Sequence, residues 1–276
     1  MKKNEKYEVG FLGYGRMAQA VSEGLDRCGR IPYARQAASD LAAGDWAGGE
    51  WLKLAEKRHF HPAPDNRSLT ALCPVVIVAV KPHQVRAVLE EVRPTASGRL
   101  FISIAAGIKT ADLKAGLPKT AGLVRVLPNL PALTGRGMSL MCAPPGAPRE
   151  HLDQARAIFE AVGEVEELGE DKFDVGTAVS GSGPAYFFLM MEALIRGAVR
   201  LGLTWETARK LVLETARGAA ETARARPDLN LAALRDQVTS PGGTTAEALQ
   251  VLETGGFSGL LAEALEAAAE KGRQLG

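Results

Sequence analysis

The chain has 276 residues, more than a typical single domain, so its length predicts two domains. Its 33 lysines and arginines nearly cancel its 32 aspartates and glutamates, and no dense basic run occurs, so nucleic acid is not expected as a partner. Cys28, Cys73 and Cys142 have neither disulfide nor zinc spacing, which predicts a reducing compartment such as the cytoplasm. The first residues lack a signal-peptide core and the apolar run 185–195 is short, so no membrane association is expected.

The first predicted element is a strand from Tyr7 to Leu12, and a glycine-rich turn follows it. The turn, Gly13-Tyr-Gly-Arg-Met-Ala18, is a Gly-x-Gly-x-x-Ala variant of the dinucleotide fingerprint, and a helical pattern continues to Gly29. Glycines let the backbone approach a pyrophosphate, while the helix N-terminus supplies positive potential. The order strand, turn, helix favours a dinucleotide site over a tight turn without a ligand.

The next stretch, Ala34 to Asp40, is expected to hold the second strand although it is only weakly apolar. Asp40 is the nearest acidic candidate for the adenosine ribose, which would favour NAD. Arg35 and Lys53 are candidates for a 2′-phosphate, so the choice between NADH and NADPH stays open.

A continuous apolar run from Val75 to Val80 is typical of a strand covered on both faces in a parallel sheet. It brings Lys81 to the carboxyl end of the strand, where open α/β sheets bind ligands. Lys81 is therefore a candidate cofactor contact, with a solvated cation as the alternative. The segment 41–57 before this run has no clear pattern, and the role of its Trp46 and Trp51 stays open.

Further strands are predicted over the segments 100–107, 123–127, 138–141 and 165–168. The first of them ends in the small residues Ala105, Ala106 and Gly107, which suit a backbone pressed against a flat ring or simply end the strand. After Gly169 no convincing strand remains, and alanine, leucine and glutamate dominate. The predicted domains are therefore 1–170 and 171–276.

The second half is predicted to be helical and to pair with another chain. A glycine-rich turn at 180–184 opens a helix over Ala185 to Leu201 that is apolar on nearly every side. Such a helix must be buried, and a domain of about a hundred residues covers one poorly by itself. Further helices are expected from Thr204 and over 260–268, and the half is expected to form a dimer.

The last informative stretch is a turn from Val238 to Thr245 that contains Ser240-Pro-Gly-Gly-Thr-Thr245. Thr244 and Glu247 have the spacing of a capping box, so a helix is expected to begin there and to end at Gly255. A bare turn before a helix N-terminus presents N–H groups and a partial positive charge. It is a candidate seat for a small anion such as a carboxylate, or else an ordinary loop and cap.

Together these motifs resemble the pyrroline-5-carboxylate reductase family from Val9 to about Arg273. They are, in chain order, Gly13–Ala18, Ala79–Pro82, Ala105–Gly107, Pro128–Pro131, Gly181–Tyr186 and Ser240–Thr245. Each is modest alone, but their order and intervals are specific. The resemblance implies reduction of 1-pyrroline-5-carboxylate to L-proline with NADPH or NADH. It also implies an α/β, Rossmann-like N-terminal domain with a mostly parallel sheet, and an all-α dimerisation domain whose dimers can assemble further.

By the same resemblance, the residues that line the cofactor would be Gly13, Gly15, Arg16, Met17, Asn66, Ala79, Lys81 and Ala106. Those that bind substrate would be Ser240, Gly243, Thr244 and Thr245, with Thr245 as the catalytic residue at the ring nitrogen. A cyclic imine accepts hydride directly, so no nucleophile or metal is required. Two rivals stay open: a related imine or keto-acid reductase, and a non-catalytic dinucleotide-sensing dimer.

Overall fold

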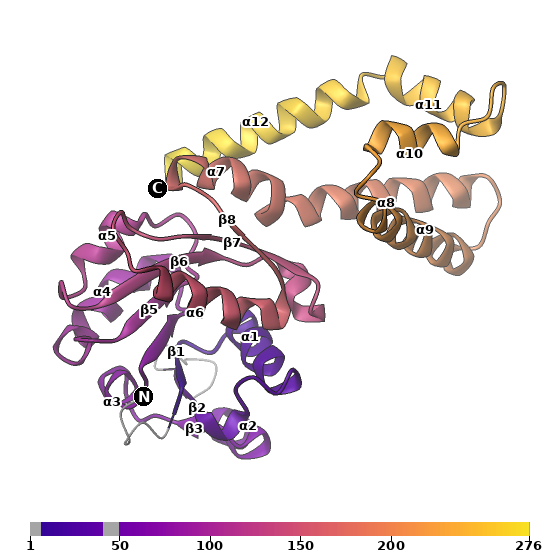
Figure 1. The fold of residues 1–276 in the computed structure, drawn as a ribbon. Coiled ribbons are helices and arrows are strands. Elements are labelled where there is room, and N and C mark those ends of the chain that lie inside the picture. The colour runs from indigo at the N-terminus through magenta and orange to yellow at the C-terminus, as the bar shows by residue number, and fades with distance from the viewer. Residues whose placement is uncertain (1–6, 41–49, 276) are drawn as a thin grey trace. The chain divides into compact units, whose positions relative to one another are not determined.

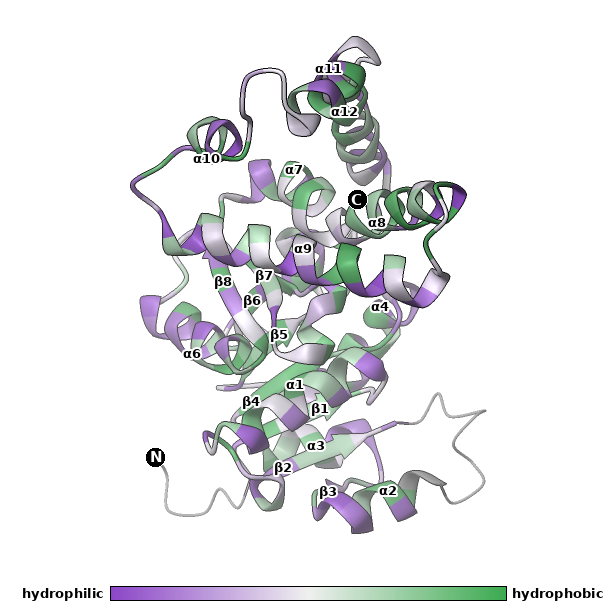
Figure 2. Cartoon of the chain, turned by 90° about the vertical axis from the view of Figure 1, so that its right-hand side faces the viewer, coloured by the Kyte–Doolittle hydropathy of each residue, from purple (hydrophilic) through white to green (hydrophobic). Residues whose placement is uncertain are grey.

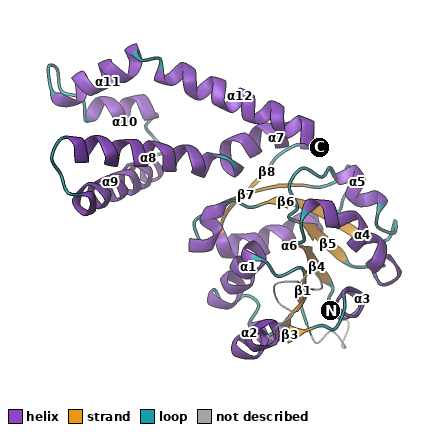
Figure 3. Cartoon of the chain, turned by 180° about the vertical axis from the view of Figure 1, so that it is seen from behind, coloured by secondary structure: helices purple, strands orange, loops and turns teal. Residues whose placement is uncertain are grey.

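An eight-stranded sheet is the frame of the N-terminal half (Figures 1 and 3). The computed structural model of the chain describes residues 7–40 and 50–275, so Trp46 and most of the predicted 41–57 segment lie outside the described residues. The strands are β1 (Val9–Leu12), β2 (Gln36–Ser39), β3 (His61–Pro62), β4 (Val75–Val78), β5 (Leu100–Ser103), β6 (Gly122–Leu127), β7 (Gly137–Cys142) and β8 (Gly163–Glu167).

The strand order is β3-β2-β1-β4-β5-β6-β7-β8. The first six strands in this order are parallel, β7 is antiparallel to β6, and β8 is parallel to β7. The order β3-β2-β1-β4-β5-β6 is that of dinucleotide-binding sheets. The prediction of a Rossmann-like domain with a mostly parallel sheet is therefore confirmed.

Helices cover both faces of this sheet, because alternate side chains of each strand point to opposite faces. On one face Val9, Phe11 and Ile77 pack with α1 (Arg16–Arg27) and α6 (Arg149–Phe159). On the other face Leu12 and Val76 pack with α3 (Asn66–Leu72), α4 (Pro82–Val92) and α5 (Thr110–Ala115). This half also contains α2 (Glu50–Arg58), α7 (Phe173–Gly176), a π-helix, η6 (Thr177–Gly181), and several short 3-10 helices.

The chain divides by its internal contacts into two compact units. The first, called the sheet unit here, is Met1–Ser182 together with Ala268–Gly276; the second, the helical unit, is Gly183–Ala267. The helices after the π-helix are α8 (Gly183–Arg200), α9 (Trp205–Ala225), α10 (Leu231–Gln237), α11 (Thr244–Thr254) and α12 (Phe257–Leu275). The last turns of α12 belong to the sheet unit.

The helix α8 is largely apolar (Figure 2), and several of its apolar side chains are exposed in a single chain. Phe187, Phe188, Leu189 and Leu194 are each more than half exposed. The helical run from Glu170 to Arg200 is also long and apolar enough, by composition alone, to be a candidate membrane span. These exposed apolar side chains are unfavourable in water, so burial against another surface would stabilise the helix.

Several predicted elements differ from the structure at their ends. The two-residue strand β3 and the helices α2, α3, α5 and α10 were not predicted. The strands expected over 75–80 and 100–107 end at Val78 and Ser103, because their last residues leave the ladder and form the loops at the sheet edge. Thr204 caps α9 as predicted, since its hydroxyl accepts from the amide of Thr207. Cys28, Cys73 and Cys142 are free thiols in the structure.

Candidate functional site

The turn between β1 and α1 is built around two glycines with different tasks. Gly13 has φ of +84°, and a Cβ there would lie 3.1 Å from the carbonyl carbon and oxygen of Ala79. This position therefore requires glycine for its conformation and for the close approach of β4. Gly15 is exposed, and a Cβ on it would meet no atom within 4 Å. The protein packs nothing against Gly15, so its side faces room for a ligand.

The first turn of α1 has unoccupied hydrogen-bond donors. Gly15 is the N-cap of this helix, and no side chain caps it. The first turn carries no acidic residue, and Arg16 is exposed at its first position. Free amides, the helix dipole and a guanidinium group attract the phosphates of a dinucleotide. The residues present therefore fit a dinucleotide, which lies with its pyrophosphate at this helix N-terminus in sheets of this kind.

The other predicted cofactor residues follow the neighbouring strands. Ala79 and Lys81 come after β4, and Ala106 comes after β5. Lys81 is exposed and is the N-cap of α4, where its amide donates to the side-chain oxygen of Gln84 at 3.1 Å. The strands β1, β4 and β5 are adjacent and parallel, so their carboxyl ends lie at the same side of the sheet. That side therefore gathers seven predicted cofactor residues: Gly13, Gly15, Arg16, Met17, Ala79, Lys81 and Ala106.

Asn66 lies at the start of α3, and its side chain is buried and engaged. Its Oδ1 accepts a hydrogen bond from the hydroxyl of Ser39 at 2.7 Å, and its Nδ2 donates to Glu91 Oε2 at 2.7 Å. These bonds hold α3 against the end of β2 and against α4. The structure thus gives Asn66 a packing task at the same edge of the sheet.

Asp40 follows β2 and reaches the glycine turn. Its Oδ2 accepts a hydrogen bond from the amide of Tyr14 at 3.0 Å. A carboxylate is thereby fixed beside the turn, at the strand end where such folds bind the adenosine ribose. Arg35 lies at the opposite end of β2 and forms an ion pair with Glu8, and Lys53 is exposed on α2. Arg35 is therefore not in position to meet a 2′-phosphate beside Asp40.

Asn129 joins the end of β6 to the π-helix η6, and sequence reasoning did not assign it a task. Its Nδ2 donates to the carbonyl of Ser180 at 2.9 Å, and its Oδ1 accepts from the amide of Met138 at 2.9 Å. Its burial makes both bonds costly to lose. The motif Pro128–Pro131 contains this residue, but nothing in the sequence pattern pointed to Ser180, which lies 51 residues away.

A second network that sequence reasoning missed surrounds Glu170. This carboxylate accepts from the amide and the hydroxyl of Thr110, at 2.7 and 2.6 Å, and from Arg125 at 3.1 Å. Arg125 is buried and stacks over the ring of Phe173, 4.2 Å from its centroid. Burial raises the pKa of Glu170, but the Thr110 hydrogen bonds and the Arg125 charge outweigh it, so the pKa is lowered overall. The network fixes the segment that leads into α7.

The four predicted substrate residues lie together in the turn that opens α11, in the helical unit. Gly242 has φ of +69°, and the amide of Gly243 donates to the carbonyl of Ser240 at 3.0 Å. The helix begins at Thr244 as expected, but its N-cap is Gly243 and no side chain caps it. The predicted capping box of Thr244 and Glu247 is therefore wrong, because Gly243 takes the extended cap conformation in place of Thr244.

The missing cap changes the chemistry of this turn. Without a side-chain acceptor, the first amides of α11 are left to bind an external anion. Thr244 is exposed and Thr245 is half-buried at the first two helical positions, where their hydroxyls accompany those amides. The turn can therefore hold a carboxylate through main-chain N–H groups and offer a hydroxyl beside it.

Two further features concern the Tyr186 hydroxyl and the side chains that could bind a metal. The hydroxyl of Tyr186 is buried and has no hydrogen-bond partner among the described residues. No three histidine, cysteine, aspartate or glutamate side chains gather into a metal-binding group within residues 7–40 and 50–275. Each unit contains a helix N-terminus without a side-chain cap, that of α1 in the sheet unit and that of α11 in the helical unit.

Comparison with family models divides the chain into two matched regions. Residues 170–275 match the model described as pyrroline-5-carboxylate reductase dimerisation. Residues 8–107 match the model described as NADP oxidoreductase coenzyme F420-dependent. The exposed apolar residues of α8 lie within the region that matches the dimerisation model.

The chain is similar over its full length to proteins named pyrroline-5-carboxylate reductase. The chain is 37% identical over 269 residues to the pyrroline-5-carboxylate reductase of Synechocystis sp., with 98% of each chain covered. It is 38% identical to that of Pseudomonas aeruginosa, with 97% of this chain and 96% of the relative covered. A solved pyrroline-5-carboxylate reductase from Coxiella burnetii superposes with a TM-score of 0.90 at 37% identity and 98% coverage of both chains. A Plasmodium falciparum pyrroline carboxylate reductase, solved with NADP bound, gives 0.85 at 30% identity and 99% coverage of both.

Proposed function

The chain belongs to the pyrroline-5-carboxylate reductase family, and we propose that its two units share the work of reducing 1-pyrroline-5-carboxylate to L-proline. The protein is an NAD(P)H-dependent oxidoreductase that acts on a C=N bond, in the last step of proline biosynthesis. The observation that carries the division of work is the pair of uncapped helix N-termini, at Gly15 in the sheet unit and at Gly243 in the helical unit.

The sheet unit holds the cofactor in this proposal. The amides after Gly15 and the guanidinium of Arg16 bind the pyrophosphate, and Lys81 adds a positive charge at the end of β4. Gly13 and Met17 shape the turn, while Ala79 and Ala106 leave flat, small surfaces against which a ring can lie. When bound, the reduced nicotinamide supplies the hydride. Asn66 acts indirectly, since it holds the end of β2 through Ser39.

The helical unit holds the substrate. The amides at Thr244 and Thr245 bind the carboxylate, with Ser240 and Gly243 beside them in the same turn. The hydroxyl of Thr245 donates to the ring nitrogen or accepts from it as the imine becomes an amine. Reduction adds hydride to the imine carbon and a proton to nitrogen, so the residues need to align the ring rather than form a bond to it.

The dimerisation region has a consequence for assembly. The family of this region and the exposed apolar side chains of α8 support a homodimer. Assembly of such dimers into a larger oligomer, and a cytoplasmic location, belong to the same proposal. The location is supported by the three free thiols, which fit a reducing compartment.

Asp40 supports a preference for NADH over NADPH. Its carboxylate, fixed by the Tyr14 amide, would accept from a ribose hydroxyl and would repel a 2′-phosphate. No lysine or arginine occurs between Asp40 and Lys53 in the sequence. We expect Asp40→Ser to lower the Kd for NADPH and raise that for NADH, each about tenfold or about 1.4 kcal/mol. Cofactor fluorescence measures both Kd values, and Asp112→Ser, an exposed change on α5, is the matched control.

The activity itself is tested by oxidation of NADH and NADPH with 1-pyrroline-5-carboxylate, beside a panel of other cyclic imines and 2-oxo acids. We expect kcat/KM to be largest for 1-pyrroline-5-carboxylate. A larger kcat/KM for another imine or a keto acid would assign the chain to a different reductase activity. Cofactor binding without turnover of any of them would instead support the sensing role.

A further inference from the structure

A second cavity lies at the amino ends of the strands, at the sheet edge opposite the glycine turn. Its volume is about 540 Å³, within the range of small-molecule sites. The residues before or at the start of β1, β4, β5 and β6 form one wall, and α6 forms another. We call it the amino-edge cavity. The cofactor fingerprint lies at the carboxyl ends of the same strands, so this cavity is separate from the cofactor site.

The side chain of His151, which lines this cavity, has a ring nitrogen without a hydrogen-bond partner among the described residues. The ring of His151, on α6, packs against Gly122 so closely that a Cβ at Gly122 would lie 2.5 Å from His151 Cε1. Glycine at the start of β6 is therefore what makes room for the imidazole. The Nδ1 atom of His151 is buried and has no hydrogen-bond partner among the described residues. A buried polar atom without a partner is destabilising, so a ligand gains affinity if the ring turns to present this nitrogen to the cavity that His151 lines.

The charged groups around the cavity favour an anion. Three guanidinium groups line it, those of Arg30, Arg35 and Arg99, against the carboxylates of Glu8 and Glu150. Arg35 pairs with Glu8, while the nearest carboxylate to Arg30 is that of Glu160 at 3.7 Å, with both side chains nearly half exposed. A pair so long and so exposed is weak. Arg30 can therefore turn to a ligand at little cost.

The rest of the lining is apolar. Ile31, Leu100 and Ile158 are buried side chains that line the cavity, and Val75 lies beside them. A surface of this kind suits a flat or aliphatic body and gives no affinity to a bare ion. The cavity thus combines an apolar floor, the weakly paired guanidinium group of Arg30 and one imidazole nitrogen without a partner among the described residues.

We propose that the amino-edge cavity binds a small organic anion of about mononucleotide size. Its apolar body rests on Ile31, Leu100 and Ile158, and its phosphate or carboxylate lies against Arg30. A polar hydrogen of the ligand, or an acceptor if the imidazole tautomer carries its proton on Nδ1, pairs with His151. This inference does not depend on the reaction at the other edge of the sheet.

The test is calorimetric titration of the full-length dimer saturated with NAD⁺, which keeps the probes out of the cofactor site. The probes are AMP, which joins a flat ring to a phosphate, indole-3-acetate, which joins one to a carboxylate, adenosine and inorganic phosphate. We expect AMP or indole-3-acetate to bind saturably, and adenosine and inorganic phosphate to bind at least tenfold more weakly. Binding of AMP alone would identify a phosphate ligand, and binding of indole-3-acetate alone a carboxylate ligand.

Variants locate the binding. We expect Arg30→Glu and His151→Ala each to raise the Kd of the bound probe at least tenfold. The matched control Arg86→Glu, a change at an exposed arginine on α4, should leave it within twofold. Each variant should keep the wild-type melting temperature and NADH Kd. No saturable binding of AMP or indole-3-acetate up to 1 mM would overturn the proposal, and so would equal binding in Arg30→Glu and His151→Ala proteins that remain folded.

Discussion

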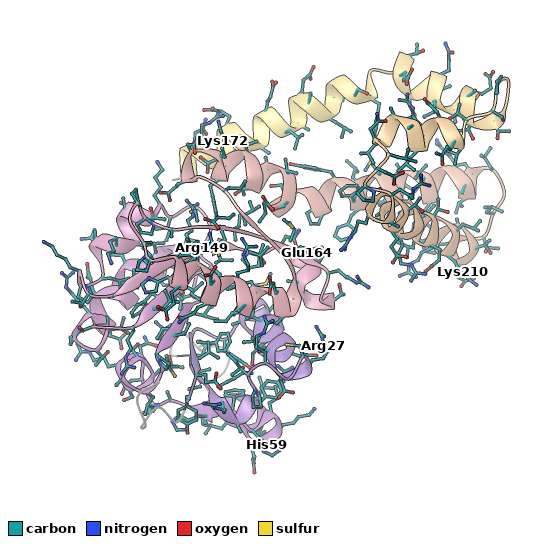
Figure 4. The ribbon with its side chains drawn as sticks, viewed as in Figure 1. Arg27, His59, Arg149, Glu164, Lys172 and Lys210 are labelled. Carbon is teal, nitrogen blue, oxygen red and sulfur yellow. The ribbon has the colours of Figure 1, made fainter. Side chains whose placement is uncertain are left out.

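The sheet unit buries its large apolar side chains within one chain, whereas the helical unit leaves several of them exposed. In the sheet unit two clusters, one on each face of the sheet, enclose residues such as Phe11, Phe101 and Leu89 almost completely. In the helical unit Phe187 and Leu189 remain 59% and 67% exposed in a single chain. Figure 4 draws the side chains of both units, with Lys210 labelled on α9 and Arg149 at the start of α6.

The difference indicates which unit folds by itself. Burial of apolar area is the main stabilising term in folding, and the sheet unit obtains it within one chain. The region that contains the helical unit matches a dimerisation model, and in the homodimer proposed above a second copy would cover α8. In that case the stability of the helical unit depends on protein concentration, whereas that of the sheet unit need not.

The largest effect should come from a charge placed in the helical unit. We expect Leu189→Glu to raise the dimer dissociation constant at least a thousandfold, or about 4 kcal/mol, because a twofold interface buries the unpaired carboxylate twice. Sedimentation equilibrium measures the constant. Leu72→Glu, at an exposed leucine on α3, is the control and should leave it unchanged. A Leu189→Glu protein that remains a stable dimer would remove α8 from the interface.

The next largest effect is expected from a substitution that impairs substrate binding in the helical unit and leaves cofactor binding in the sheet unit unchanged. A valine side chain at Gly243 would begin with a Cβ 2.3 Å from Ser240 Oγ and 3.1 Å from its carbonyl oxygen, so it would fill the turn. We expect Gly243→Val to lower kcat/KM for the imine at least a hundredfold, about 3 kcal/mol, with the NADH Kd unchanged. Steady-state kinetics and cofactor fluorescence measure the two. Tight substrate binding in this variant would contradict the carboxylate seat.

A smaller loss is expected at the hydroxyl beside that seat. Thr245→Ala should lose about 1–3 kcal/mol of transition-state stabilisation, roughly ten- to a hundredfold in kcat/KM, because one hydrogen bond to the ring nitrogen disappears. Thr245→Ser keeps a hydroxyl and should recover most of the rate. If Thr245→Ala retains the wild-type kcat/KM, Thr245 has no part in the reaction.

The smallest effect concerns the sheet unit and its pH dependence. The pKa of Glu170 is lowered in the folded protein from its ordinary 4.5, so its contribution is present above pH 4.5 and is lost as the pH falls through the folded pKa. We expect Glu170→Gln to cost about 1–2 kcal/mol at pH 7. Urea unfolding followed from pH 7 to pH 3 should show this difference shrink. The exposed Glu56→Gln is the control, and a difference independent of pH would exclude the titration of Glu170 as its cause.

Local patterns predicted the parts of the site that depend on neighbours in sequence. The glycine turn after β1 and the apolar run of β4 were recognised because strand, turn and helix follow one another directly. The family resemblance drawn from these motifs is confirmed by full-length relatives. The individual roles assigned to Arg16, Lys81 and Thr245 remain predictions.

Features that depend on distant partners were missed. Thr110 and Glu170 lie 60 residues apart, and Asn129 and Ser180 lie 51 apart, so no local pattern reveals either bond. The strand β3 has two residues and exists because β2 offers it a ladder. The cap of α11 was assigned one residue too late, since Thr-x-x-Glu spacing describes composition and not which residue takes the extended conformation.

The end of α12 has a consequence for how the helical unit is attached. Residues 268–275 return to the sheet unit, where a Cβ at Gly272 would lie 3.4 Å from Cβ of Asp174, on α7 (Figure 1). The helical unit is thus an insertion with two covalent connections, at 182–183 and at 267–268. Deleting it to isolate the nucleotide half would require joining those two positions, and cutting the chain after 182 would instead remove a part of that half.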